Sequence, residues 1–343
     1  MRKFTINDSN IMKGTAIILM LIHHLFFSEE YIQKCTLILP LEGKFLLFLS
    51  SLSKVCVAIF VVISGYGLYK SYISTSATGG GYKKTILFIF SHIWNLLKQY
   101  WIIVIPFALL GIVTGWRTLY DAYGRNWVGK LITDIFGLNY LLYGTTNLFN
   151  VTCWYLGVAI LFFILTPLFC WLVKKNPILL IGFSMLLGYD HLLVQRRIGL
   201  HYILAFVIGM LLSKYEILDK IKSMKKDRYY LLGSICLVLA TAAVRYNYGI
   251  VIDGFFALSI IIFMLDIIDN LPKVASVIRL IGKHATTIFM MHTFIFMYYF
   301  SRIIYAAKYP VLVLLFLLVT CLVYSIILDI IYKRIKVLME KLK

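Results

Sequence analysis

Charged residues are scarce in this chain of 343 residues: Asp, Glu, Lys and Arg make up 14%, against 61% hydrophobic residues. A soluble globular domain carries about 25% charged residues, so this composition excludes that class. The six cysteines are scattered and form no Cys-x-x-Cys pair, so we predict neither a disulfide framework nor a metal site. Acidic residues are also few, 15 against 34 Lys and Arg, which leaves a net charge of +19. In so apolar a chain we expect this charge to face an anionic membrane leaflet, and we predict no nucleic-acid partner.

Long apolar runs recur from one end of the chain to the other, close to the length that a helix needs to cross a bilayer. They are continuous, as in "VLVLLFLLVTCLVYSIIL", and lack the period-two alternation of a membrane β-barrel. We therefore predict an all-α polytopic membrane bundle of about ten transmembrane helices. With neither a repeat nor a linker in the sequence, residues 1–343 are expected to form a single domain. The predicted spans are 11–27, 47–69, 99–115, 153–173, 177–193, 199–213, 229–245, 250–268, 284–304 and 309–331.

The distribution of basic residues predicts the orientation of the chain. With the N-terminus in the cytoplasm, the inner segments hold 23 of the 34 Lys and Arg residues. The stretch "SKYEILDKIKSMKKDR" (213–228) and the tail "YKRIKVLMEKLK" are the strongest indicators. We predict a multi-pass plasma-membrane protein with both termini in the cytoplasm.

The longest loop, about residues 116–152, lies outside the cell in this arrangement and is rich in aromatic side chains. We predict an interfacial helix near 127–137. Loops of this length are often functional. An aromatic belt at the membrane surface explains the same composition equally well.

Two adjacent histidines interrupt the first apolar run, in "LMLIHHLFF" (19–27). A polar side chain inside a membrane helix is costly and therefore marks a candidate functional residue. Because a helix turns about 100° per residue, Lys13 and His24 share a face, about 16 Å apart along the axis, whereas His23 points roughly 80° away. A neutral imidazole can take a proton from a hydroxyl group and later return it. A histidine that hydrogen-bonds to a neighbouring helix explains the sequence equally well, and this alternative suits His23 better.

The segment "NIMKGTAIILMLIHH" resembles the opening of the bacterial membrane acyltransferase-3 family, where a basic residue, ten intervening residues and a histidine occupy the first span. Lys13 and His24 match that spacing. The chain has lysine where the family usually has arginine, and only Lys98, near His92, where the third span commonly has two arginines. The resemblance continues, in order, in "VAIFVVISGYGLY" (57–69), "NLLKQYWIIVIP" (95–106), "CWYLGVAILFFILTPL" (153–168) and "IGKHATTIFMMHTFIF" (281–296).

This resemblance implies an O-acyltransferase of the bacterial plasma membrane that moves an acyl group, most often acetyl, from cytoplasmic acyl-CoA to a hydroxyl group. The acceptor would be a cell-envelope polysaccharide or a lipid-linked glycan. His24 would be the catalytic base, and Lys13 and Lys98 would bind the CoA phosphates as point charges. Acetyl-CoA would be a donor substrate, and no permanently bound cofactor is expected. Snorkelling of Lys13 to the membrane boundary is an equally good explanation of that residue.

Further residues are candidates for substrate binding, each with a structural alternative. Trp154 and Tyr155 suit stacking against a sugar, although aromatic pairs are more common as membrane-interface anchors. His292 either orients a ligand or is a core histidine bonded to Thr287 or a backbone carbonyl. Lys54 interrupts apolar sequence near the outer end of the second span, where snorkelling is favoured over substrate contact. A transporter or flippase for a lipid-linked sugar is the alternative function, because ten spans with buried polar groups fit it too.

Overall fold

The computed structural model describes residues 2–38, 41–77, 81–144, 149–188, 199–224 and 227–341, and within these ranges all regular structure is helical. The α-helices are α1 (Ile6–Leu25), α2 (Glu29–Ile32), α3 (Gly43–Ser53), α4 (Cys56–Ala77), α5 (Gly81–Val113), α6 (Leu119–Tyr123), α7 (Trp127–Ile135), α8 (Asn139–Tyr143), α9 (Trp154–Lys175), α10 (Pro177–Gly188), α11 (Ile203–Lys214), α12 (Ile217–Ser223), α13 (Arg228–Tyr248), α14 (Asp253–Asn270), α15 (Pro272–Lys283), α16 (Ala285–Thr293), α17 (Ser301–Tyr305) and α18 (Pro310–Lys341). Short 3₁₀ turns and one π-helix complete the order, as η1 (Val151–Cys153), η2 (Leu200–Tyr202), η3 (Gly249–Ile252) and the π-helix η4 (Phe294–Tyr299).

The predicted all-α membrane bundle is confirmed, but the number of spans differs from the prediction. By length and composition, five helical stretches of the described chain qualify as spans, and two bent helix pairs raise the number to seven. The stretches are Gly43–Ala77, Gly81–Val113, Val151–Lys175, Arg228–Asn270 and Pro310–Arg334, and the bent pairs are Leu200–Lys214 with Ile217–Ser223 (63°) and Pro272–Lys283 with Ala285–Tyr299 (66°). The count of ten is therefore not confirmed.

The shortfall has identifiable causes. The first predicted span corresponds to α1, whose polar first turns and two histidines lower its hydropathy below that of the qualifying helices. The fifth corresponds to α10, which is shorter than a full span, and its predicted end, 189–193, lies outside the described residues. The seventh and eighth share the stretch Arg228–Asn270, within which α13 and α14 pack against each other. The third, predicted at 99–115, is not part of the shortfall: it corresponds to the second half of α5, which begins at Gly81 and qualifies as a span.

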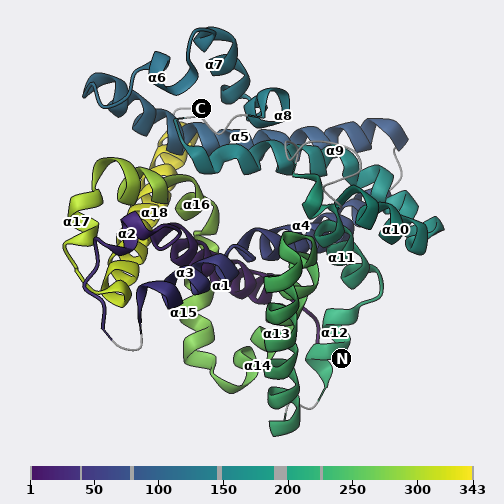
Figure 1. Cartoon of the computed structure of the whole chain (residues 1–343). Coiled ribbons are helices and arrows are strands. Elements are labelled where there is room, and N and C mark those ends of the chain that lie inside the picture. The colour runs from purple at the N-terminus through teal and green to yellow at the C-terminus, as the bar shows by residue number, and fades with distance from the viewer. Residues whose placement is uncertain are drawn as a thin grey trace.

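Helices α1 and α4 lie at the centre of the bundle (Figure 1). In this view α5 and α9 run along one side and α13 and α14 lie on the other, while α16 to α18 and α10 to α11 occupy the two flanks. The α4–α11 crossing has no room for side chains: a Cβ added at Gly65 would stand 2.2 Å from the carbonyl oxygen of Phe206, and one at Gly209 would stand 2.0 Å from that of Val62. Small residues allow such backbone contact between membrane helices.

A second close crossing joins α1 to α15. A Cβ at Gly14 would stand 2.0 Å from the carbonyl oxygen of Ile278, and one at Gly282 would stand 1.6 Å from that of Asn10. Both glycines therefore serve contact between two helices. This crossing fixes the rotation of α1, and with it the direction in which the polar residues of α1 point.

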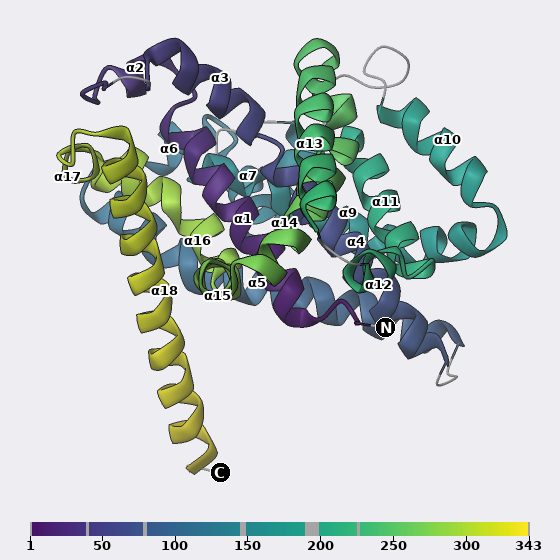
Figure 2. The same ribbon diagram turned by 90° about the horizontal axis from the view of Figure 1, so that it is seen from below.

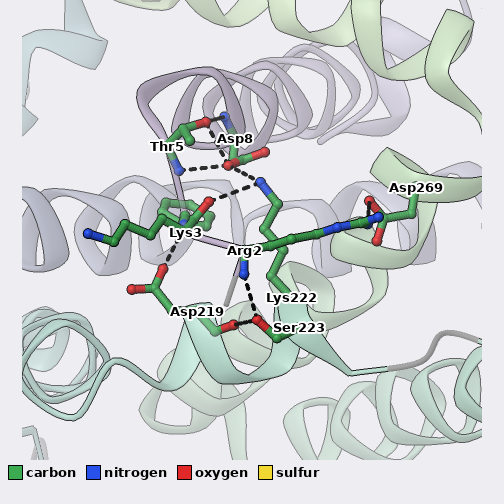
Figure 3. Close-up of polar contacts among 9 residues, drawn as sticks. Arg2, Lys3, Thr5, Asp8, Asp219, Lys222, Ser223 and Asp269 are labelled. Carbon is green, nitrogen blue, oxygen red and sulfur yellow. Dashed lines mark hydrogen bonds and ion pairs between the residues drawn. The ribbon is translucent and has the colours of Figure 1, made fainter.

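The beginning of α1 is held by a polar cluster (Figure 3). Thr5 and Asp8 form a capping box, in which each side chain binds the backbone N–H of the other residue. Lys222 of α12 donates to Asp8 Oδ2 at 2.6 Å, and the Asp219 carboxylate accepts from the backbone N–H of Phe4. Arg2 pairs with Asp269 at 3.6 Å. The N-terminal segment is thus tied to α12 and to the end of α14.

The loop predicted to be functional or interfacial folds as three short helices, α6 to α8. α7 spans Trp127–Ile135 and thus falls on the helix predicted near 127–137. The loop has its own buried polar contact, in which the Tyr123 hydroxyl donates to Asp134 Oδ2 at 2.5 Å. It is also fastened to α5, because Trp101 Nε1 donates to the carbonyl oxygen of Ile135 at 2.7 Å.

The two chain ends point the same way. Figure 2 shows the N-terminus and the end of α18 towards one end of the molecule, with α2 and α3 at the opposite end. This placement is compatible with termini on one side of a membrane, and their cytoplasmic location stays a prediction.

Candidate active site

A cavity of about 270 Å³ lies between α1, α4, α9 and α16. Its wall is mainly apolar, with residues such as Phe60, Phe162 and Phe289. The polar residues in the wall come from separate parts of the chain and are Lys13, His23, His24, Lys54, Ser64, Thr152, Trp154, Tyr155 and Thr286. A mainly apolar pocket with a few convergent polar groups is the usual form of a binding site.

Lys13 and His24 both line this cavity, as their shared helix face predicts. Their spacing of eleven residues returns the side chains to nearly the same direction, and the α1–α15 crossing turns that direction towards the interior. Among the described residues, no acidic side chain joins the cavity wall and no hydrogen bond engages the His24 ring. The cavity therefore presents an imidazole with available nitrogens and ammonium groups without a counter-ion.

His23 also reaches the cavity wall, but its ring is engaged elsewhere. Its Nδ1 lies 2.9 Å from the carbonyl oxygen of Ser50, and the Ser50 hydroxyl donates to the carbonyl oxygen of His23 at 2.9 Å. These contacts join α1 to α3. This is the helix-bridging role that the sequence favours for His23.

His292 lies behind His24 and is absent from the cavity wall. Its side chain is fully buried, and the two imidazole rings are in contact, with centroids 5.0 Å apart. Its Nδ1 lies 2.9 Å from the carbonyl oxygen of Phe289, the backbone bond that the sequence leaves open as an alternative. Thr286 of α16 lines the cavity, whereas its neighbour Thr287, the side-chain partner considered for His292, does not.

Trp154 and Tyr155 lie at the start of α9, and both line the cavity. The Trp154 ring stands between Tyr140 and Tyr202, with centroid distances of 5.4 and 6.2 Å. The Tyr155 ring packs edge-on against Phe289 of α16, with centroids 5.8 Å apart. Both aromatic side chains are therefore held in place by their neighbours, as an aromatic surface for ligand stacking requires.

Lys98 lies apart from the other predicted site residues. It does not line the cavity, and its Nζ instead lies 3.4 Å from the hydroxyl of Tyr332 on α18 and 5.8 Å from the centroid of that ring. Its role in binding CoA stays a prediction, without support from the cavity.

The structure places one further sequence candidate, Lys54, in the cavity wall and adds Thr152, which the sequence did not single out. Lys54, for which snorkelling was favoured, lines the cavity from the junction of α3 and α4, and Thr152 lines it from η1. A buried network places Thr152: Asn150 Oδ1 accepts from Thr152 Oγ1 at 2.6 Å and from Thr293 Oγ1 at 2.8 Å, while Asn150 Nδ2 donates to the carbonyl oxygen of Met290 at 2.6 Å. The interruption of an apolar run was the available signal for Lys54, and no local pattern marks Thr152.

These features define a polytopic membrane protein with a cavity lined by histidine and lysine. A family profile described as an acyltransferase domain matches residues 6–330, which confirms the resemblance, and the chain belongs to the acyltransferase-3 family. Comparison with curated proteins and with solved structures finds no match.

Proposed function

We propose that this protein is a membrane O-acyltransferase that moves an acyl group, acetyl in the simplest case, from acyl-CoA to a hydroxyl group of a cell-envelope or lipid-linked carbohydrate. The family supports acyl transfer in general. The donor, the acyl group, the acceptor and the role of His24 are parts of the proposal. It places the protein in the bacterial plasma membrane, with the donor entering from the cytoplasm.

One observation carries this proposal: a single helix presents Lys13 and His24 to one cavity, opposite the aromatic side chains of Trp154 and Tyr155. A cavity with lysines and with no acidic residue among its described wall residues favours an anionic substrate such as the phosphate-bearing donor. Ligand pockets commonly occupy about 300–1,000 Å³. The observed volume of about 270 Å³ therefore suits the reacting ends of two substrates, with the adenosine part of CoA outside.

The proposed reaction needs one base and one acid, and His24 serves as both. A ring nitrogen of His24 takes the proton of the acceptor hydroxyl while that oxygen attacks the thioester carbonyl carbon. The Thr286 hydroxyl, in the same wall, is available to donate to the oxyanion that forms. The C–S bond then breaks, the CoA sulfur takes the proton from the His24 imidazolium, and the acyl ester leaves with the acceptor.

Mass spectrometry of envelope glycan tests the proposal, in cells that lack the gene and carry either the wild-type chain or a variant. We expect wild type to add acyl groups and His24→Ala to reduce this about 10²–10⁴-fold, the range typical of a general base. His23→Ala should be milder because that ring is bonded to Ser50. His92→Ala is the matched control: His92 lies on α5 outside the cavity wall, with Nδ1 2.8 Å from the carbonyl oxygen of Phe88.

Two results would contradict the proposal. Full acylation by a His24→Ala protein present at the wild-type level would show that His24 is not the catalytic base. An unchanged glycan mass in all strains, together with altered glycan export that needs no acyl-CoA, would favour the transporter.

A further inference from the structure

His292 has a defined hydrogen-bonding state in this structure. Its Nδ1 lies 2.9 Å from the carbonyl oxygen of Phe289 and 3.2 Å from that of Ile288. A carbonyl oxygen only accepts hydrogen bonds, so Nδ1 carries the hydrogen. The Nε2 of the neutral ring then holds a lone pair, and within the described part of the chain this buried atom has no hydrogen-bond partner.

The group next to this ring is His24. The two rings are in contact at a centroid distance of 5.0 Å and an interplanar angle of 45°. A histidine base normally needs an acceptor on its second nitrogen to fix its tautomer and to stabilise the imidazolium. A carboxylate is the usual acceptor, and no acidic residue of the described chain lines the cavity.

We propose that His292 is the positioning residue of His24. The bond is not formed in this structure: a turn of the His24 ring brings the nitrogen that faces away from the substrates to the unpartnered Nε2 of His292, which accepts a hydrogen bond from it. This inference rests on the proposed function, and it moves His292 from substrate contact to action through His24. The acceptor proton goes to the cavity-facing nitrogen of His24 and then to the CoA sulfur. The other His24 N–H keeps its hydrogen throughout, so His292 stays neutral.

The surroundings of His292 are built to hold its ring still. The Phe296 ring stacks on it at 6.1 Å and 13°. Asn150 binds the carbonyl oxygen of Met290 and the hydroxyl of Thr293, on both sides of His292 in the sequence. The π-helix η4 begins at Phe294, and such distortions often occur at functional sites.

Two substitutions separate positioning from packing. His292→Gln keeps a side-chain acceptor, whereas His292→Phe keeps a ring without one. With acetyl-CoA and chemically de-O-acylated envelope glycan as substrates for the purified protein, we expect His292→Phe to lower kcat about 100-fold, with both KM values within about twofold of wild type. His292→Gln should recover most of that loss.

A spectroscopic measurement covers the case in which a variant folds poorly. Ring nitrogen NMR of ¹⁵N-histidine-labelled wild type, with signals assigned through His24→Gln and His292→Gln, should show His292 as the Nδ1–H tautomer and a single fixed tautomer of His24. In His292→Phe the His24 signals should shift, whereas His292→Gln, which keeps an acceptor, should retain the wild-type tautomer of His24.

Equal kcat values for wild type and His292→Phe would overturn the inference, as would a raised KM at unchanged kcat, which indicates direct substrate contact. A His24 tautomer that is the same in His292→Phe as in wild type, or wild-type His24 in a mixture of tautomers, would also overturn it. Absence of acyl transfer in wild type is a different failure: it refutes the proposed function, while the NMR result still decides whether the rings are coupled.

Discussion

A methyl group added at Gly282 tests the crossing of α1 and α15, on which the direction of Lys13 and His24 depends. Its Cβ would stand 1.6 Å from the carbonyl oxygen of Asn10 and 2.8 Å from the backbone nitrogen of Gly14, where ordinary contact begins at 3.4 Å. Both obstacles are backbone atoms, so no side-chain rotation relieves the clash. The helices must separate by almost 2 Å, and we expect Gly282→Ala to destabilise the protein by about 3 kcal/mol, the upper end for overpacking.

Gly233→Ala is the matched control for this prediction. Gly233 lies inside α13, and a Cβ built there meets nothing within 4 Å. Alanine is favoured over glycine in a helix by roughly 0.5–1 kcal/mol, so this variant should be slightly more stable than wild type. The midpoint of thermal unfolding in detergent should therefore fall for Gly282→Ala and rise slightly for Gly233→Ala. Gly282→Ala should also lose acyl transfer. A Gly282→Ala protein whose unfolding midpoint equals or exceeds that of wild type would refute the reasoning.

Two further predictions concern buried carboxylates. Burial raises the pKa of the Asp134 carboxyl from 3.8 to about 6, against the opposing effect of the Tyr123 hydrogen bond. The folded state therefore holds the Asp134 proton more tightly than the unfolded state does. We expect the free energy of unfolding to fall by roughly 2–3 kcal/mol as the pH rises from about 4 through 6. Asp134→Asn should remove that slope from the thermal midpoint, and an unchanged slope would contradict the assignment. Lys222→Met should lower the free energy of unfolding by about 3 kcal/mol, because it leaves the Asp8 carboxylate, which is 6% exposed, without its cation. The control Lys220→Met removes an exposed lysine of the same helix and should change the thermal midpoint little. Equal effects of the two substitutions would contradict the role of Lys222 as the partner of Asp8.

Local rules account for much of the fold. Continuous apolar runs predict helices because only helices and closed barrels satisfy every backbone hydrogen bond in lipid. The capping residues Thr5 and Asp8 set the first turn of α1 at Ile6, five residues before the apolar run begins at Ile11. The count of ten spans is not confirmed, because α1 is too polar, α10 is too short, and α13 and α14 fall within one continuous helical stretch.

The sequence by itself determined that Lys13 and His24 share a face, because helical rotation follows from residue number alone. Only the tertiary structure decided that this face meets a cavity, that Lys54, Thr152 and Trp154 join it, and that Lys98 does not. It also placed His292 behind His24, across 268 positions of chain. The physical reason is that these relations depend on which helices cross and at what rotation, and the crossings are set by backbone contacts at paired glycines far apart in the sequence, such as Gly14 and Gly282.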